Sequence, residues 1–576
     1  MDTTTPAPEP VMFSVAAHEA EELRAAGLNC LLAGQAADAQ QLFRAGAIKH
    51  PADIDFRYRL ASATLAKGDE QEAALYLADA RNLHGQSIVD GNIGELAGKP
   101  LGTEQKLNLG HSFYGHGQIT AASVLFQRVA EERPDDLNVL SVLALSLMHQ
   151  VRTEDCPATY ETIIRRLGSS PSTHSALHYA RVFEQAGPQT LFEEGRRWRQ
   201  LCEDRVARRP QRAVGIGAKL RVGYFSPTFN GHQLAHFFLP ALEAHDRTRF
   251  EIRCYSHADA DDKVGRAVVA ASDGFSNLHG LSDDAFCDRI AADGVDILVD
   301  LWGHNAGNRL MAFAQRPAPV QVSWLNYINT TGLTAFDAVL HPDGYRVDGD
   351  QAWFSEPIHN VGPVVAPYRV FDAAPDAGPT PALSGGGYRF VSAAHPAKIN
   401  LDVVRTWSAI LREAPHVTLE LRYSYYKDPA LRRSIGALFE SCGVAAERIL
   451  FPPPETGAEF RRALQQADLV LDPFPYQGMT TTLDALAVGV PVLAYEGDYL
   501  AVRVAASALR VCGLDELVAA SLDEYIANAI ALANDPVLTN AIRQRVRPAF
   551  EASAWRDEAG FTQRLEAVFE RLAAAA

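Results

Sequence analysis

Residues 469–497, with the sequence LVLDPFPYQGMTTTLDALAVGVPVLAYEG, decide how the C-terminal half of this chain folds. Leu469–Leu471 is a short apolar run, which is typical of a strand covered on both faces. A Gly-containing loop follows, and the threonines at 480–482 predict the start of a helix. Val492–Tyr495 predicts a second strand, so the stretch is a strand–helix–strand unit of a parallel sheet.

The helix start in this unit is a candidate phosphate-binding site. Thr480 and Thr481 lie at its first residues and Asp484 lies one turn later. Unpaired backbone N–H groups and the positive end of the helix dipole attract anions there. Ligands of such sheets bind at the carboxyl ends of the strands, where this loop lies. The alternative is a threonine-rich helix cap with nothing bound.

Composition indicates a soluble globular protein. Its 576 residues suggest roughly three to five domains. No apolar run of about 18 residues predicts a transmembrane helix, and the start MDTTTPAPEPV lacks the features of a secretory signal. A formal net charge of −17 argues against general binding to nucleic-acid backbones. Seven scattered cysteines without a CxxC pair fit reduced thiols, so we expect a cytoplasmic protein that binds neither nucleic acid nor membrane.

The first 200 residues contain a repeated pattern of small and apolar residues. Gly34, Ala39, Phe43 and Pro51 recur with the same spacings as Gly117, Ala122, Phe126 and Pro134. Gly68 also follows Gly34 by 34 residues, the period of the tetratricopeptide repeat, which this pattern resembles. Such repeats stack helical hairpins into a surface that binds polypeptides. A plain helical bundle is the alternative.

From Leu220 onward, predicted strands alternate with helices, which indicates α/β domains with mainly parallel sheets. The strands of a first domain are LRVGYFS (220–226), FEIRCYSH (250–257), VDILVDLWG (295–303) and PVQVSWLNY (319–327). Those of a second are YRFVSAA (388–394), VTLELRYS (417–424), RILFPPP (448–454), LVLDPF (469–474) and VPVLAYEG (490–497). Two Rossmann-like lobes joined in this way leave a cleft, and such clefts commonly bind ligands.

The predicted fold class is α/β with an all-α N-terminal part, namely a tetratricopeptide-like α-solenoid followed by two Rossmann-like lobes. The predicted parts are a flexible tail (1–15), helical repeats (16–210), an N-terminal Rossmann-like lobe (218–370), a Pro- and Gly-rich linker (371–387) and a C-terminal nucleotide-binding Rossmann-like lobe with a terminal helix (388–576).

Histidine and basic side chains follow several predicted strands. His232 lies after the first strand, where an imidazole would accept a proton or bind a substrate, and His304 follows another strand. His395 and Lys398 follow the first strand of the second lobe, and a lysine there would neutralise phosphate oxygens. Structural histidines and a surface lysine are the alternatives. The segment HADADD (257–262) is expected to be a solvated acidic loop, with a metal site as the alternative.

Four motifs follow the repeats in a fixed order: LRVGYFSPTFNGH (220–232), ILVDLWGHNAGNR (297–309), RPAPVQVSWLNYINTTG (316–332) and DPFPYQGMTTTLDALAVGVPV (472–492). Together they resemble the O-linked N-acetylglucosamine transferases of glycosyltransferase family 41, in particular the shorter bacterial homologues. The SPINDLY-type O-fucosyltransferases of plants belong to the same family. The resemblance implies a two-lobed GT-B fold and metal-independent, inverting transfer from a nucleotide sugar to Ser or Thr of a protein.

The resemblance also implies roles for individual residues. His232 matches the family's active-site histidine, and Lys398 matches the lysine that stabilises the leaving diphosphate. Thr480 and Thr481 match the pair that binds phosphate, and Asp484 matches the carboxylate that helps to hold the nucleotide ribose. Further predicted site residues are His395, His304 and Asn326 near the nucleotide sugar, His174 as a loose match to a histidine once proposed as the base, and Arg461 and Arg462 as substitutes for nucleotide-contacting residues of the animal enzymes.

Several positions depart from the animal pattern. Thr228 replaces an aspartate and Leu234 replaces a threonine, while Asn326 and Ile328 replace a glycine and a proline beside the sugar pocket. Met479 replaces a histidine before the threonine pair.

We predict a protein O-glycosyltransferase that uses UDP-N-acetylglucosamine and needs no cofactor or metal ion, with a polypeptide acceptor bound by the repeats. The alternatives are another donor, such as GDP-fucose, and a peptide-binding scaffold that binds nucleotide without transferring sugar.

Overall fold

The computed structural model describes residues 11–93, 101–151, 155–184, 186–214, 219–346, 348–371 and 378–576. The chain divides into two compact units, Met1–Val151 with Ile399–Pro454, and Arg152–Lys398 with Glu455–Ala576. Residues 1–10 of the predicted tail and 372–377 of the predicted linker lie outside the described residues. Helix α1 begins at Val11, within the range predicted as tail.

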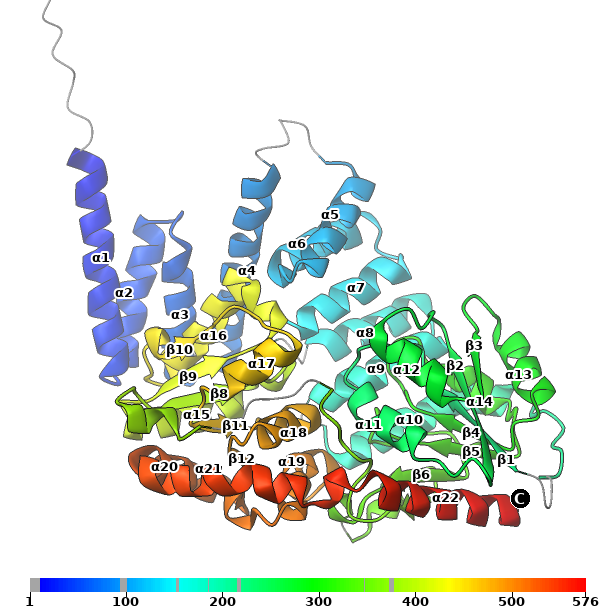
Figure 1. Ribbon diagram of the computed structural model, residues 1–576. Helices are drawn as coiled ribbons and strands as arrows, with labels where there is room; N and C mark the ends of the chain where they lie inside the picture. Colours follow the sequence, from blue (N-terminus) through cyan, green and yellow to red (C-terminus); the bar gives the residue numbers. More distant parts are fainter. Residues whose placement is uncertain are drawn as a thin grey trace, which may run out of the picture. The chain divides into compact units, whose positions relative to one another are not determined.

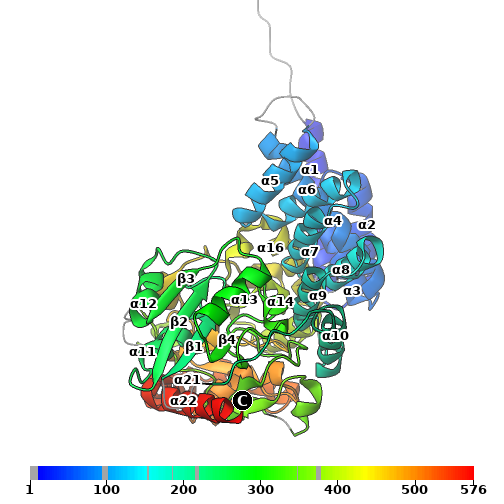
Figure 2. The ribbon, with the colours of Figure 1, turned by 90° about the vertical axis from the view of Figure 1, so that its right-hand side faces the viewer.

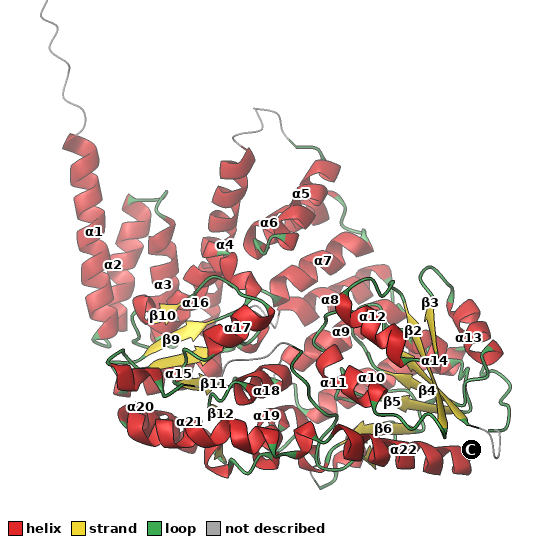
Figure 3. Cartoon of the chain, in the orientation of Figure 1, coloured by secondary structure: helices red, strands yellow, loops and turns green. Residues whose placement is uncertain are grey.

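The first unit is an array of helices in which α1 to α4 each pack against the next, α4 packs on α6, and α6 packs on both α5 and α7 (Figures 1 and 3). The helices are α1 (Val11–Leu32), α2 (Ala36–Lys49), α3 (Ile54–Ala66), α4 (Glu70–Ile93), α5 (Thr103–Gly115), α6 (Ile119–Glu132) and α7 (Leu137–Met148). Gly34, Gly68 and Gly117 each join the two helices of a hairpin, with φ of 78°, 88° and 79°. Glycine adopts this left-handed backbone without strain, so the repeated sequence pattern corresponds to a repeated helical hairpin.

The phenylalanines of the repeat pack against glycines of the preceding helix. Phe43 and Phe126 are fully buried. A Cβ added to Gly27 would lie 2.4 Å from the Phe43 ring, and one added to Gly110 would lie 2.6 Å from the Phe126 ring. The helices of both hairpins therefore approach so closely that a larger residue does not fit without rearrangement.

A later segment of the chain belongs to the same unit. It contains α15 (Leu401–Glu413), β9 (Thr418–Leu421), α16 (Pro429–Ser441) and β10 (Ile449–Leu450), and β9 pairs with β10 in parallel. Helix α16 packs on α3 and α4. Its Arg433 donates hydrogen bonds to Asp55 (2.7 Å) and Glu440 (3.2 Å). The predicted lobe of 388–576 thus contributes one segment to the first unit, because α16 buries a face against the repeats.

The second unit contains a seven-stranded parallel sheet with the order β3-β2-β1-β4-β5-β6-β7. Three helices precede it, and its elements are α8 (Asp155–Leu167), α9 (Pro171–Phe183), α10 (Pro188–Leu201), β1 (Leu220–Phe225), α11 (Ala235–Glu243), β2 (Phe250–Ser256), α12 (Lys263–Ala271), β3 (Gly274–Asn277), α13 (Asp283–Ala292), β4 (Ile297–Asp300), α14 (Leu310–Ala314), β5 (Val320–Ser323), β6 (Ala338–His341) and β7 (Ile358–Asn360). Helices α11 and α12 lie on one face and α13 and α14 on the other (Figure 2). The four predicted strands are confirmed as β1, β2, β4 and β5.

The strand order of this sheet reverses between β1 and β4. Strands β2 and β3 follow β1 on one side, whereas β4 to β7 lie on the other side. The loops that leave the carboxyl ends of β1 and β4 therefore diverge, and a crevice at such a point is where ligands of open parallel sheets bind. The first loop carries His232 and the second carries His304.

The second unit also contains β8, β11, β12 and β13, in which β11 pairs with β8 and β12, and β12 pairs with β13, all in parallel. The elements are β8 (Arg389–Ser392), α17 (Gly457–Leu464), β11 (Leu469–Leu471), α18 (Met479–Ala487), β12 (Val492–Tyr495), α19 (Val504–Val511), β13 (Val518–Ala519), α20 (Leu522–Asn534), α21 (Pro536–Glu551) and α22 (Glu558–Ala575). The strand–helix–strand unit predicted for 469–497 is confirmed as β11, α18 and β12.

The C-terminal helix α22 returns to the seven-stranded sheet. Its Phe561 stacks on Trp324 with ring centroids 5.9 Å apart, and its Glu566 accepts a hydrogen bond from His245 (2.9 Å). Both lobes are therefore joined within the second unit by packing as well as by the chain. Across the described ranges, every helix is too short or too polar to cross a lipid bilayer.

Candidate functional site

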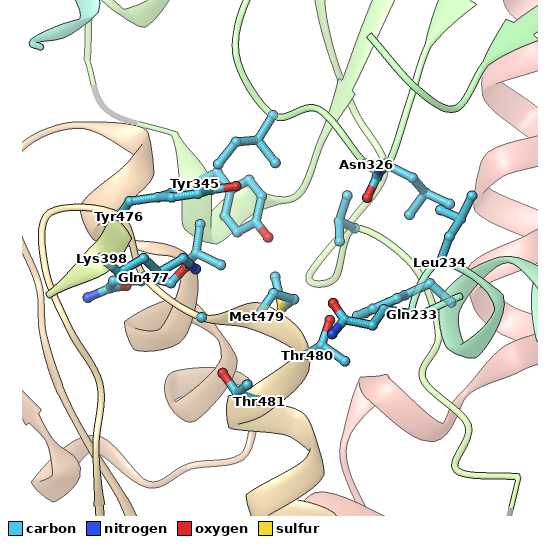
Figure 4. A pocket seen from close by; sticks show the side chains of 16 residues that line it. Gln233, Leu234, Asn326, Tyr345, Lys398, Tyr476, Gln477, Met479, Thr480 and Thr481 are labelled. Carbon is cyan, nitrogen blue, oxygen red and sulfur yellow. The ribbon is translucent and has the colours of Figure 1, made fainter. Parts of the chain in front are cut away.

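A pocket in the second unit lies between loops of the two lobes (Figure 4). The N-terminal lobe lines it with Gln233, Leu234, Phe237, Leu325, Asn326, Ile328, Tyr345 and Val365, and the C-terminal lobe with Lys398, Tyr476, Gln477, Gly478, Met479, Thr480, Thr481 and Val504. Of the predicted site residues, the structure brings together Lys398, Thr480, Thr481 and Asn326.

The start of α18 forms one wall of this pocket. Gly478 is the residue before the helix and has no side chain to cap it. The Thr482 hydroxyl donates a hydrogen bond to the Gly478 carbonyl (2.6 Å), so this threonine is directed to the backbone. Thr480 and Thr481 instead line the pocket, next to the first N–H groups of the helix. This is the environment that binds a phosphate or another anion.

Lys398 lies in the loop after β8 and contributes the positive charge of the pocket. Its ammonium donates a hydrogen bond to the Gln477 carbonyl (2.9 Å) and lies 4.2 Å from the centroid of the Tyr476 ring. The ring face attracts a cation at this distance. Burial lowers the pKa of Lys398, and the charge of Asp472 opposes that change. The ammonium is thus poorly hydrated, which strengthens its attraction for an anion.

His232 lies in the loop before α11 and is not part of the pocket wall described above. Its exposed side chain has its ring 5.3 Å from that of Trp302. Its Nδ1 accepts a hydrogen bond from the Leu234 N–H (3.2 Å), so the proton of the neutral ring is on Nε2. Although the side chain is exposed, the protein around it lowers the pKa of His232 by desolvation. The neutral ring offers an N–H donor to a ligand.

The acidic segment 257–262 supports the loop that carries His232. Asp262 accepts hydrogen bonds from the N–H groups of Gly231 (2.7 Å) and Gly265 (2.7 Å), so it joins this loop to the start of α12. Among the described residues, no group of three or more His, Cys, Asp and Glu side chains is arranged to hold a metal ion. Asp262 is the N-cap residue of α12.

Asp484 is buried in α18 and does not line the pocket. Its carboxylate lies 3.5 Å from the guanidinium of Arg461, which is buried in α17. Burial raises the pKa of Asp484, and the positive charge of Arg461 opposes that change. Arg462, the next residue, is exposed. The Asp484–Arg461 pair joins the two helices that flank β11.

The other predicted histidines also lie outside the pocket wall. His304 is buried, with Nδ1 bonded to the Ser175 hydroxyl (3.0 Å) and Nε2 to the Thr331 carbonyl (2.8 Å), and burial lowers its pKa to about 4. Both of its nitrogens are thus occupied, so the structure gives it a packing role instead of a place in the pocket. His395 is half-buried, and its Nδ1 accepts a backbone N–H (3.0 Å). His174 is buried in α9, and neither ring nitrogen has a hydrogen-bond partner within the described part of the chain.

Some pocket residues were not identified from the sequence. The hydroxyl of Tyr345 is buried with no hydrogen-bond partner among the described residues, although the side chain lines the pocket. Burial raises the pKa of Tyr345, so the phenol keeps its proton. Gln233 lies opposite Thr480 in Figure 4. Gln233 could have been predicted as a site residue because it is adjacent to His232 in the sequence. Tyr345 follows a strand that the sequence pattern does not predict.

Two Rossmann-like lobes with a pocket between their loops are the architecture of the GT-B glycosyltransferases. The model of glycosyl transferase family 41 matches residues 197–344 and 390–565, and the chain belongs to this family.

A mutant of the O-GlcNAc transferase of Thermobaculum terrenum has a similar structure, with a TM-score of 0.76, 26% identity, and coverage of 97% of this chain and 98% of that one. A probable UDP-N-acetylglucosamine–peptide N-acetylglucosaminyltransferase, SPINDLY, of Solanum lycopersicum is 33% identical over 61% of this chain. The SEC protein of Arabidopsis thaliana, with the same enzyme name, is 27% identical over 69% of it. The alignments span 38% and 43% of those two relatives.

Proposed function

We propose that this chain transfers N-acetylglucosamine from UDP-N-acetylglucosamine to serine or threonine hydroxyls of proteins, with inversion at the anomeric carbon. The observation that carries this proposal is the pocket where Lys398 and the start of α18 converge, in a chain of family 41. A lysine and a helix start together suit a diphosphate. The similarity to a solved O-GlcNAc transferase over nearly the whole chain supports the sugar and the acceptor class.

In the proposed reaction, the acceptor oxygen bonds to the anomeric carbon while the bond from that carbon to the β-phosphate oxygen breaks, and UDP leaves. Negative charge grows on the diphosphate, where Lys398 and the first N–H groups of α18 stabilise it. His232 donates its Nε2–H to the donor and orients it. The hydroxyl proton leaves to a donor phosphate oxygen or to water, because Thr228 stands where the animal pattern has a carboxylate.

Peptide glycosylation tests this proposal. The purified chain is incubated with UDP-N-acetylglucosamine and a library of serine- and threonine-containing peptides, and mass spectrometry detects the addition of one N-acetylhexosamine. We expect modification by the wild type and by Lys219→Met, which removes an exposed lysine, but not by Lys398→Met. The proposal fails if the wild type modifies no peptide, or if Lys398→Met is as active as the control.

A second donor, such as GDP-fucose, is favoured by one specific observation. Leu234, Asn326 and Ile328, which depart from the animal pattern, all line the pocket. Side chains at these positions would alter the shape offered to the sugar. Hydrolysis of UDP-N-acetylglucosamine and of GDP-fucose is measured in competition to identify the donor. A larger kcat/KM for GDP-fucose would favour it as the donor over UDP-N-acetylglucosamine.

A peptide-binding scaffold without transferase activity is a third candidate, since Met479 lines the pocket where the animal pattern has a histidine. Nucleotide binding without modification of any peptide would favour it. For all three candidates we propose a polypeptide bound by the helical repeats, a nucleotide or nucleotide sugar in the pocket, no metal ion and no nucleic-acid or membrane partner. The seven free cysteines support a cytoplasmic location.

A further inference from the structure

Among the described residues, two groups are seen to contact the Lys398 ammonium, and neither carries a formal charge. One is the carbonyl of Gln477, at 2.9 Å, and the other is the ring of Tyr476, at 4.2 Å from its centroid. Burial without a counter-charge favours the neutral amine, which would not attract a diphosphate. A charged partner is therefore needed if Lys398 is to act as a cation.

Asp472 supplies a carboxylate of the matching charge. It follows β11 directly and is 3% exposed. Its Oδ1 accepts a hydrogen bond from the N–H of Gly478 (3.0 Å), the residue that precedes α18. Its Oδ2 is buried, with no hydrogen-bond partner among the described residues. A carboxylate in this position is unfavourable as an anion unless a cation lies near it.

The two charges support each other. Burial raises the pKa of Asp472 and lowers that of Lys398, and each group opposes the change in the other. Tyr476 and Tyr345 also line the pocket, but burial raises the pKa of each phenol, so both are neutral. His395 lies three residues before Lys398 and its Nδ1 accepts a backbone N–H. The Gln477 carbonyl, which accepts from Lys398, and the Gly478 N–H, which donates to Asp472, belong to one peptide group, so the two side chains bind the two ends of a single peptide bond.

We infer that Asp472 is a positioning residue of the diphosphate site, which keeps Lys398 protonated and, through Gly478, fixes the start of α18. One buried carboxylate thus connects the two positive elements that the leaving group would contact. That the ligand is a diphosphate rests on the proposed function. The effect of Asp472 on the protonation of Lys398 is independent of that function.

Asp472→Asn tests the inference, because it removes the charge and keeps both the shape and an oxygen that accepts from Gly478. The 576-residue chain is acetylated with acetic anhydride across a pH series, and peptide mass spectrometry reports the fraction of reactive, neutral Lys398. The pH at which half of Lys398 is neutral and reactive is the midpoint of this titration. We expect that midpoint to fall by about 1 to 3 pH units in the variant. Asp498→Asn removes the same charge from an exposed position and should leave the midpoint unchanged.

Calorimetric titration with UDP over the same pH series provides the second measurement. Lys398 is charged below its pKa and neutral above it, so UDP binding should weaken as the pH rises. In Asp472→Asn this weakening should begin at a lower pH than in the wild type. If Asp472→Asn does not fold, Asp472→Ser retains an acceptor for Gly478 and is measured instead.

An unchanged Lys398 midpoint overturns the inference whatever UDP does. So does UDP binding that weakens by the same factor at every pH, since that indicates a purely structural role. A lowered midpoint in a chain that binds no UDP supports the inference about Asp472 and removes the proposed nucleotide site.

Discussion

Lys398→Met removes the ammonium from the pocket and keeps most of the aliphatic side chain. Lys398 is half-buried, so an effective dielectric constant of about 20 applies at a contact distance of about 4 Å between its ammonium and a phosphate oxygen. The attraction is then about 4 kcal/mol per unit charge. If it is exerted mainly in the transition state, its loss lowers kcat by about a thousandfold.

The assay separates binding from chemistry. Initial rates of UDP release are measured with a peptide acceptor while the donor concentration is varied. We expect a large fall in kcat and a smaller rise in KM, because the charge on the leaving group grows during the reaction. A folded Lys398→Met chain whose kcat is within tenfold of that of the Lys219→Met control would refute the electrostatic role.

The same substitution has a consequence for stability. Removing the ammonium leaves the Asp472 carboxyl buried without its counter-charge, which should lower the free energy of unfolding by about 1 to 3 kcal/mol. Adding Asp472→Asn should restore part of that loss but none of the turnover. Chemical denaturation of the single and double variants measures the coupling between the two side chains.

Three further substitutions test other parts of the site. Tyr345→Phe should weaken donor binding about fivefold, since one hydrogen bond contributes about 1 kcal/mol. It should not destabilise the fold, because the hydroxyl has no hydrogen-bond partner among the described residues; calorimetry measures the binding and thermal unfolding the stability. Arg461→Met should lower the free energy of unfolding by about 3 kcal/mol, because it leaves the buried Asp484 carboxylate without its arginine counter-charge, and an unchanged urea midpoint would contradict this. Asp262→Ala should reduce kcat about tenfold or more by releasing the loop that carries His232, with circular dichroism to confirm folding; full activity would show that the loop holds its position without the aspartate.

The unit at 469–497 was predictable because its signals are local. The apolar run Leu469–Leu471 is β11, the helix begins at Met479, and Val492–Tyr495 is β12. In a sheet covered on both faces, each strand is a short apolar run and the Gly-containing loops mark where it ends. Both features can be identified within the segment itself. Lys398 was found in the same way, because it follows a strand whose sequence is clear.

The positions of His304 and Tyr345 could not be predicted from local sequence patterns. His304 also follows a strand, but its ring is occupied by Ser175 and Thr331, which are 129 and 27 residues away in the chain. Tyr345 follows β6 (Ala338–His341), a strand that was not predicted from the sequence. In both cases long-range packing decides the outcome, and no pattern within either segment encodes it.

The first unit is built from two segments that are far apart in the chain, and this affects how it folds during synthesis. Its repeats leave the ribosome first, yet α16, which packs on α3 and α4, is made only after about 250 residues of the second unit have emerged. At about 5 to 20 residues per second, that interval lasts roughly 12 to 50 seconds. During it, the face of the repeats that α16 later covers, with Asp55 and Tyr58, is open to water and to chaperones. Slow synthesis of the middle of the chain would therefore prolong the exposure of its beginning.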